Sequence, residues 1–60
     1  MSIEDRMVEN LKQAAQKFRE YETLHRAKGT EESLAKAEVN EQMARTLEET
    51  LHDYYTGKDA

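Results

Sequence analysis

One glycine near the middle of the chain limits its possible folds more than any other residue. Gly29 and Gly57 are the two glycines, and none of the 60 residues is proline. The stretches on both sides of Gly29 are rich in Glu, Lys, Arg, Gln, Ala, Leu and Met, which are good helix formers. Because glycine readily adopts the positive φ that ends many helices, we expect one helix to end at each glycine.

Residues suited to begin helices lie at matching positions. Ser2 can cap a helix that begins at Ile3, with Asp5 placed three residues after the cap, and Thr30 can cap a second helix directly after Gly29. The sequence therefore predicts an all-α fold, an antiparallel helical hairpin in a single domain. Its expected parts are a helix at about 3–28, a turn at 29–30, a helix at about 31–55 and a short tail at 56–60.

Apolar residues recur at heptad spacing in both predicted helices. The seam of the first helix is expected at Met7, Leu11, Ala14, Phe18, Tyr21 and His25, so that Met7 faces Leu51 and Leu11 faces Leu47 across the hairpin. The residues predicted to form the core or a dimer interface are Met7, Val8, Leu11, Ala14, Ala15, Phe18, Tyr21, Ala37, Asn40, Met43, Ala44, Leu47 and Leu51. Asn40 is expected either inside the seam, where it fixes register, or at its rim.

The chain is too short to bury a large core by itself. Domains below about 70–80 residues usually need a disulfide, a metal or a partner subunit. Cysteine is absent, which excludes disulfides, and two histidines far apart do not predict a metal site. We therefore expect a homo-oligomer, with two hairpins forming a four-helix bundle.

Charge differs between the two halves. Residues 1–29 carry six basic and five acidic side chains, whereas residues 30–60 carry three and eight. Lys12, Arg19 and Arg26 recur every seven residues and form a basic stripe, which is either a solvated face or a contact for a partner or nucleic acid. Ion pairs at i,i+4 are expected for Glu22–Arg26, Glu32–Lys36 and Glu41–Arg45.

Other functional signals are sparse. No cofactor site, membrane-spanning run or signal peptide is expected, and the predicted location is the cytoplasm. Neither serine has a neighbouring base, so we do not expect an enzyme. Tyr54 and Tyr55 are expected either to close the end of the bundle or to anchor a partner. A small ligand held near Tyr21 and His25 is a third, lower-ranked hypothesis.

One stretch resembles a known group of proteins. It comprises Tyr21, Leu24-His25, Lys28-Gly29-Thr30, Ala35-Lys36-Ala37, Asn40, Met43-Ala44 and Glu48. These residues resemble small helical-hairpin proteins from the early regions of lambda-like temperate bacteriophages. The resemblance implies an accessory regulatory protein that binds a host factor in the host cytoplasm. The plan is also similar to that of the plasmid-encoded Rop hairpin, a dimer that binds RNA.

The sequence thus predicts a non-enzymatic protein-interaction module that pairs with itself and with a protein partner. The alternative is a small dimer that binds RNA or DNA through the basic stripe. A steep dependence of binding on salt concentration would distinguish the second from the first.

Overall fold

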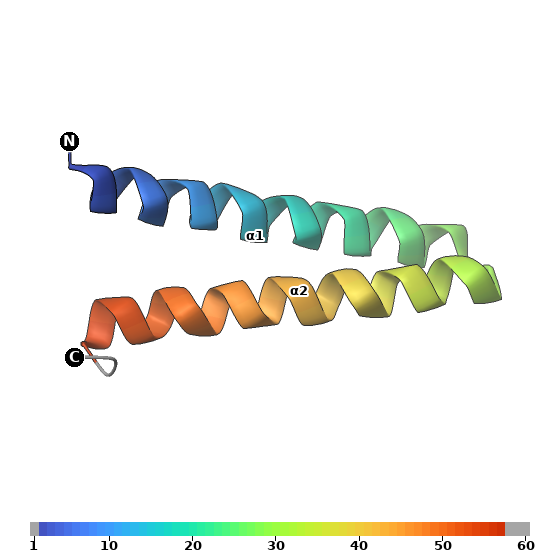
Figure 1. The fold of residues 1–60 in the computed structure, drawn as a ribbon. Coiled ribbons are helices and arrows are strands. Elements are labelled where there is room, and N and C mark those ends of the chain that lie inside the picture. The colour runs from blue at the N-terminus through green and yellow to red at the C-terminus, as the bar shows by residue number, and fades with distance from the viewer. Residues whose placement is uncertain (1, 58–60) are drawn as a thin grey trace.

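Two helices of equal length make up nearly all of the computed structural model, which describes residues 2–57 (Figure 1). α1 spans Ile3–Lys28 and α2 spans Glu31–Thr56, and each contains 26 residues. They pack side by side as an antiparallel hairpin, so the start of α1 and the end of α2 lie together (Figure 1). The predicted all-α hairpin is confirmed. α2 extends one residue past the expected end, and residues 58–60 of the predicted tail lie outside the described residues.

Side-chain caps start both helices. The Asp5 N–H donates to the Ser2 hydroxyl at 3.1 Å, and the Ser2 N–H donates back to the Asp5 carboxylate at 3.3 Å. This reciprocal pair is a capping box, as the sequence predicts. At the start of α2, the Ser33 N–H donates to the Thr30 hydroxyl at 3.1 Å. The caps satisfy backbone donors that the first turn of a helix leaves without partners.

Left-handed glycines end both helices. Gly29 has φ 71° and Gly57 has φ 72°. The Gly29 N–H donates to the Arg26 carbonyl at 3.2 Å, which closes the last turn of α1. With Thr30 already acting as the next cap, the connection contains only two residues, and this short link holds the helices antiparallel.

Gly29→Ala is expected to lower the free energy of unfolding by about 1 kcal/mol, because an L side chain disfavours positive φ. A Cβ at this position would meet no atom within 4 Å, so backbone conformation alone sets the effect. Gly57→Ala is the matched control, since its φ is the same but it lies where α2 ends and frays. Urea unfolding of both variants measures the difference, and equal midpoints would show that the turn does not depend on Gly29.

The core between the helices is made of small side chains. Its buried members are Ala15 at 5% exposure, Ala37 and Ala44 at 0%, and Ser33 at 9%. Among the described residues, no large side chain is fully buried. Small residues let the two backbones approach closely, but each removes little apolar area from water.

The side of α1 that faces α2 differs from the expected seam. The inward positions include Val8, Ala15 and Glu22, whereas Met7 and Tyr21, expected to face α2, are 60% and 51% exposed. Leu11, Phe18 and His25 of the expected seam stay half-buried, but Val8, Ala15 and Glu22 replace Met7, Ala14 and Tyr21 as its other members. Because successive helical residues are about 100° apart, exchanging three of the six positions corresponds to a rotation of about 50°. The physical reason is that the Glu22 carboxylate forms ion pairs with Arg19 and Arg26, which lets it lie largely buried on α1.

The hairpin is a thin plate. Its Cα atoms extend over 42 × 22 × 11 Å, as expected for a single layer of two helices. Because the plate is one layer of helices, each helix presents one flank on each of its broad sides.

Neither helix within residues 2–57 has an apolar stretch long enough to cross a membrane.

Candidate functional site

The two broad sides of the hairpin differ in chemistry. Arg19 and Arg26 reach across to Glu48 and Glu41, so these flanks of α1 and α2 lie on the same side, here called the charged face. The opposite flanks form the other side, here called the apolar face. Helical periodicity places on it Met7, Leu11, Ala14, Phe18 and Tyr21 of α1, and Asn40, Met43, Leu47 and Tyr54 of α2.

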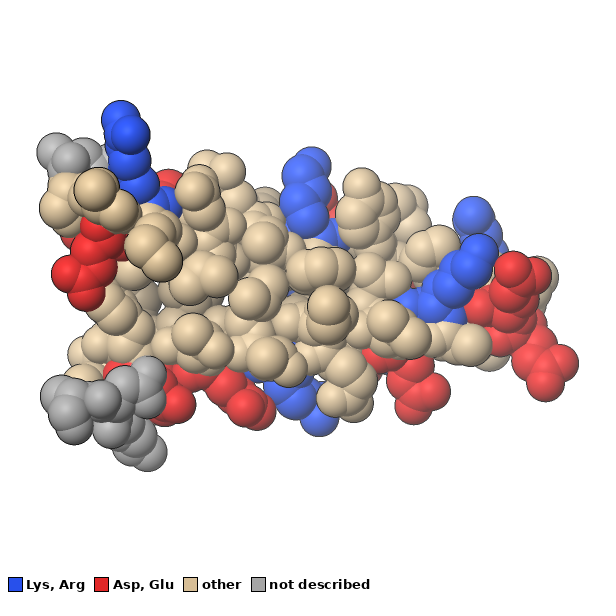
Figure 2. Space-filling view, viewed as in Figure 1, with Lys and Arg blue, Asp and Glu red and all other residues tan. Residues whose placement is uncertain are grey.

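The apolar face is open to solvent. Met7, Tyr21, Met43 and Tyr54 are 60%, 51%, 49% and 42% exposed. Figure 2 shows uncharged side chains along both helices on one broad side, with charged side chains mainly toward its margins. A continuous surface of this kind, flanked by charges, is characteristic of a protein-binding site.

On the charged face, Arg19 joins the two helices. Its Nε and Nη2 donate to the two carboxylate oxygens of Glu48 at 2.9 and 2.7 Å. Its Nη1 donates to Glu22 at 2.9 Å. The two parallel bonds to Glu48 form the bidentate geometry that makes arginine–carboxylate pairs specific.

The ion pairs continue toward the turn. Arg26 donates to Glu22 at 3.0 Å and to Glu41 at 2.6 Å, and Arg45 donates to Glu41 at 3.1 Å. Every predicted i,i+4 pair is confirmed, with Glu32–Lys36 at 3.4 Å. The pairs between helices, which sequence spacing does not reveal, turn these separate contacts into one network.

The network changes the acidity of its members. The hydrogen bond from Arg19 lowers the pKa of Glu22, and the hydrogen bond from Arg19 likewise lowers the pKa of Glu48. The same bonds, to Glu48 first and then to Glu22, raise the pKa of Arg19. Each of these ion pairs therefore favours the charged form of both partners, and the partners belong to the same chain.

Acid is expected to destabilise the hairpin through these carboxylates. Because their folded pKa values lie below the ordinary value of 4.5, their contribution is fully present above pH 4.5 and is lost as pH falls through the lowered pKa values. We expect a constant melting temperature from pH 7 to 5 and a decline below 4.5.

Glu48→Gln should flatten that decline, with the exposed Glu38→Gln as the control. Circular dichroism melts at each pH measure the effect. Acid profiles that coincide for wild type and Glu48→Gln would contradict a role for the network.

The residues of the basic stripe predicted on the first helix contact other side chains of the same chain. Arg19 and Arg26 are both bound to carboxylates, and the Lys12 ammonium lies 5.3 Å from the centre of the Tyr55 ring. A phosphate group would have to compete with these partners. Tyr55 is therefore placed on the charged face, while its neighbour Tyr54 lies on the apolar face with the rings edge to face at 5.5 Å.

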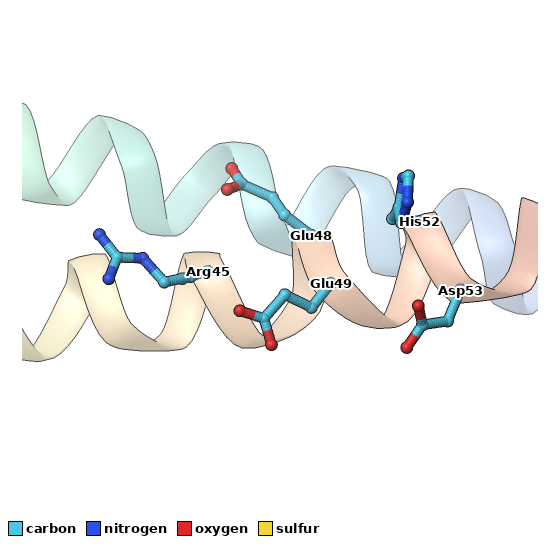
Figure 3. Close-up of a pocket in the computed structure, with 5 residues that line it drawn as sticks. All are labelled: Arg45, Glu48, Glu49, His52 and Asp53. Carbon is cyan, nitrogen blue, oxygen red and sulfur yellow. The ribbon is translucent and has the colours of Figure 1, made fainter. Parts of the chain in front are cut away.

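A hollow beside the charged face contains Arg45, Glu48, Glu49, His52 and Asp53 (Figure 3). The Glu48 carboxylate is directed toward α1, where Arg19 binds it, whereas Glu49 and Asp53 point away from α1 (Figure 3). These groups do not converge on one point. Within residues 2–57, no three His, Asp or Glu side chains are grouped so as to hold a metal ion.

Near the turn, His25 is half-buried between two shallow hollows. One also contains Tyr21 and Leu24, and the other contains Val39 and Asn40. The His25 Nδ1 is buried without a hydrogen-bond partner. The sequence allows Asn40 to lie either inside the seam or at its rim. In the structure Asn40 is half-buried, and its side-chain amide donates to the Lys36 carbonyl of its own helix at 2.8 Å.

Comparison with protein families, curated proteins and solved structures found nothing that matches this chain.

Proposed function

We propose that this chain is a non-enzymatic protein-interaction module whose apolar face binds a second copy of itself, giving a four-helix bundle. The observation that carries the proposal is the contrast between the two broad sides. The charged face pairs its arginines and carboxylates within the chain, whereas Met7 and Met43 on the other side are 60% and 49% exposed. Covering the apolar face supplies the large buried side chains that the alanine core lacks.

The hairpin exposes more surface than a compact chain of its mass, as expected for a subunit that pairs with another copy. The chain exposes 4765 Å², whereas a folded 7.0 kDa monomer typically exposes about 4,040 Å². The excess of about 700 Å² is close to the roughly 800 Å² that each partner buries in a standard interface. The radius of gyration, 13.8 Å, likewise exceeds the value of about 10.4 Å for a compact domain of 60 residues.

Nucleic-acid binding through Lys12, Arg19 and Arg26 is the second candidate. Their side chains form a row on one side of α1, but Arg19 and Arg26 are engaged by carboxylates. We expect no binding to RNA or DNA that weakens steeply with salt. Binding to a host protein, which the phage resemblance implies, stays a prediction.

The proposal is tested by adding one charge to either side of α2. Met43→Glu places a carboxylate on the apolar face and is expected to convert dimers to monomers. Gln42→Glu adds the same charge at the adjacent exposed position, which helical periodicity turns away from that face, and should remain dimeric. Sedimentation equilibrium measures both masses. Wild type and Met43→Glu with the same monomeric mass would refute the proposal.

A further inference from the structure

The apolar face of α1 is nearly symmetric about its centre. Ala14 is the middle residue, and apolar side chains follow at matching distances on both sides of it. Leu11 and Phe18 lie three and four positions away, and Met7 and Tyr21 each lie seven positions away. A helix with this pattern matches its own copy when the two run antiparallel, because large side chains then meet large ones and the small Ala14 lies at the crossing.

We infer that two copies dock with α1 antiparallel to the partner's α1, the two-fold axis passing beside Ala14 and the turns at opposite ends. The inference rests on the proposed function, since it specifies how the apolar faces meet. In this arrangement Phe18 lies over Leu11 of the partner subunit, and Tyr21 lies over Met7 of the partner subunit. The contact is isologous, as closed dimers require.

The residue pattern of α2 fits the same two-fold axis. The turn joins Lys28 to Glu31, so a residue of α1 lies at the height of the α2 residue whose number brings the sum to about 59. Ala14 therefore lies level with the neighbourhood of Ala44. About that height, Met43 and Leu47 of α2 are exchanged by the two-fold axis, and so are Asn40 and Thr50. These four positions thus each meet their own kind, while Tyr54 lies over Lys36 of the partner subunit.

The other two-fold arrangement places both turns at one end and α1 over the partner's α2. The same sum of about 59 would then set Leu11 against Leu47, Phe18 against Asn40, and Tyr21 between Lys36 and Asn40 of the other copy. Two aromatic rings would cover an amide and an ammonium group, while the matching apolar positions of the two α1 helices would stay apart. The arrangement with turns at opposite ends instead sets both rings against apolar side chains, Leu11 and Met7 of the partner subunit, and is therefore favoured.

Cysteine cross-linking tests the orientation directly, because the native chain contains no cysteine. Ala14→Cys lies next to the proposed axis, so two copies should form a disulfide, with glutathione disulfide accepting the two electrons. Ala27→Cys replaces an exposed alanine of the same helix and is the matched control. We expect at least a tenfold larger cross-linked fraction for Ala14→Cys on non-reducing gels.

A mixture of Met7→Cys and Tyr21→Cys chains should form cross-linked heterodimers, which supports the same orientation. Cross-links between Met7→Cys and Tyr54→Cys chains, without a homodimer of Ala14→Cys, would overturn it. Sedimentation of each reduced variant separates this result from failure of the proposed function. A reduced Ala14→Cys protein with dimer mass and no cross-link refutes the orientation alone, whereas a monomer refutes both.

Discussion

Phe18→Ala is expected to lower the free energy of unfolding by about 3–5 kcal/mol, the usual range for removing a phenyl ring from a core. Phe18 is half-buried in the hairpin, at the border between the alanine core and the apolar face. Its ring therefore contributes to helix packing within one chain and, in the proposed dimer, to the interface. Removing the ring therefore weakens both the packing of α1 against α2 and the proposed dimer interface.

The variant should dissociate at micromolar concentrations and lose helical circular dichroism at a lower temperature. Leu24→Ala is the control, because Leu24 is 58% exposed on the same helix and should have a much smaller effect. A Phe18→Ala protein that stays dimeric and as heat-stable as wild type would show that the apolar face is not an interface.

Ala44→Leu is expected to destabilise the hairpin by about 1–3 kcal/mol or more, because added methylenes overpack a filled interior. Ala44 and Ala37 are 0% exposed where the two backbones approach each other. A leucine side chain would push α1 and α2 apart and draw Arg19 away from Glu48, which it now binds at 2.7 Å.

Ala35→Leu is the matched control, since Ala35 is an exposed alanine of the same helix and the change in helix propensity is the same. Thermal unfolding compares the two variants. Equal melting temperatures would mean that the helices do not pack through the small residues of α2.

The helical hairpin could be predicted because its determinants are local. The capping box of Ser2 and Asp5, the Thr30 cap and the stop at Gly29 involve residues at most three positions apart. Such signals act through the backbone and need no knowledge of tertiary packing. α2 ends at Thr56 because Gly57 takes the left-handed conformation directly after it.

The rotation of α1 could not be predicted from apolar periodicity alone. The pattern favours Tyr21 over Glu22 as an inward residue, because a charged side chain is seldom buried. In the structure, Glu22 is nonetheless covered, since Arg19 and Arg26 both donate to it. The Arg19–Glu48 pair depends on that rotation, so it too lies beyond what sequence spacing reveals.

The same rotation of α1 decides which residues lie on the apolar face and which lie on the charged face. Met43 and Tyr21 are predicted as core or interface residues, and both are exposed on the apolar face. Lys12, Arg19 and Arg26 were predicted as a stripe, and helical spacing does align them, but only three-dimensional structure reveals the carboxylates and the ring that engage them.

Sedimentation equilibrium of the wild-type chain, from about 1 to 100 μM, shows whether a second copy covers the apolar face. If a hairpin this thin is stable because a second copy covers its apolar face, the mass is twice 7.0 kDa and the melting temperature rises with concentration. A single 7.0 kDa chain, fully helical and with a melting temperature independent of concentration, would contradict the proposed dimer.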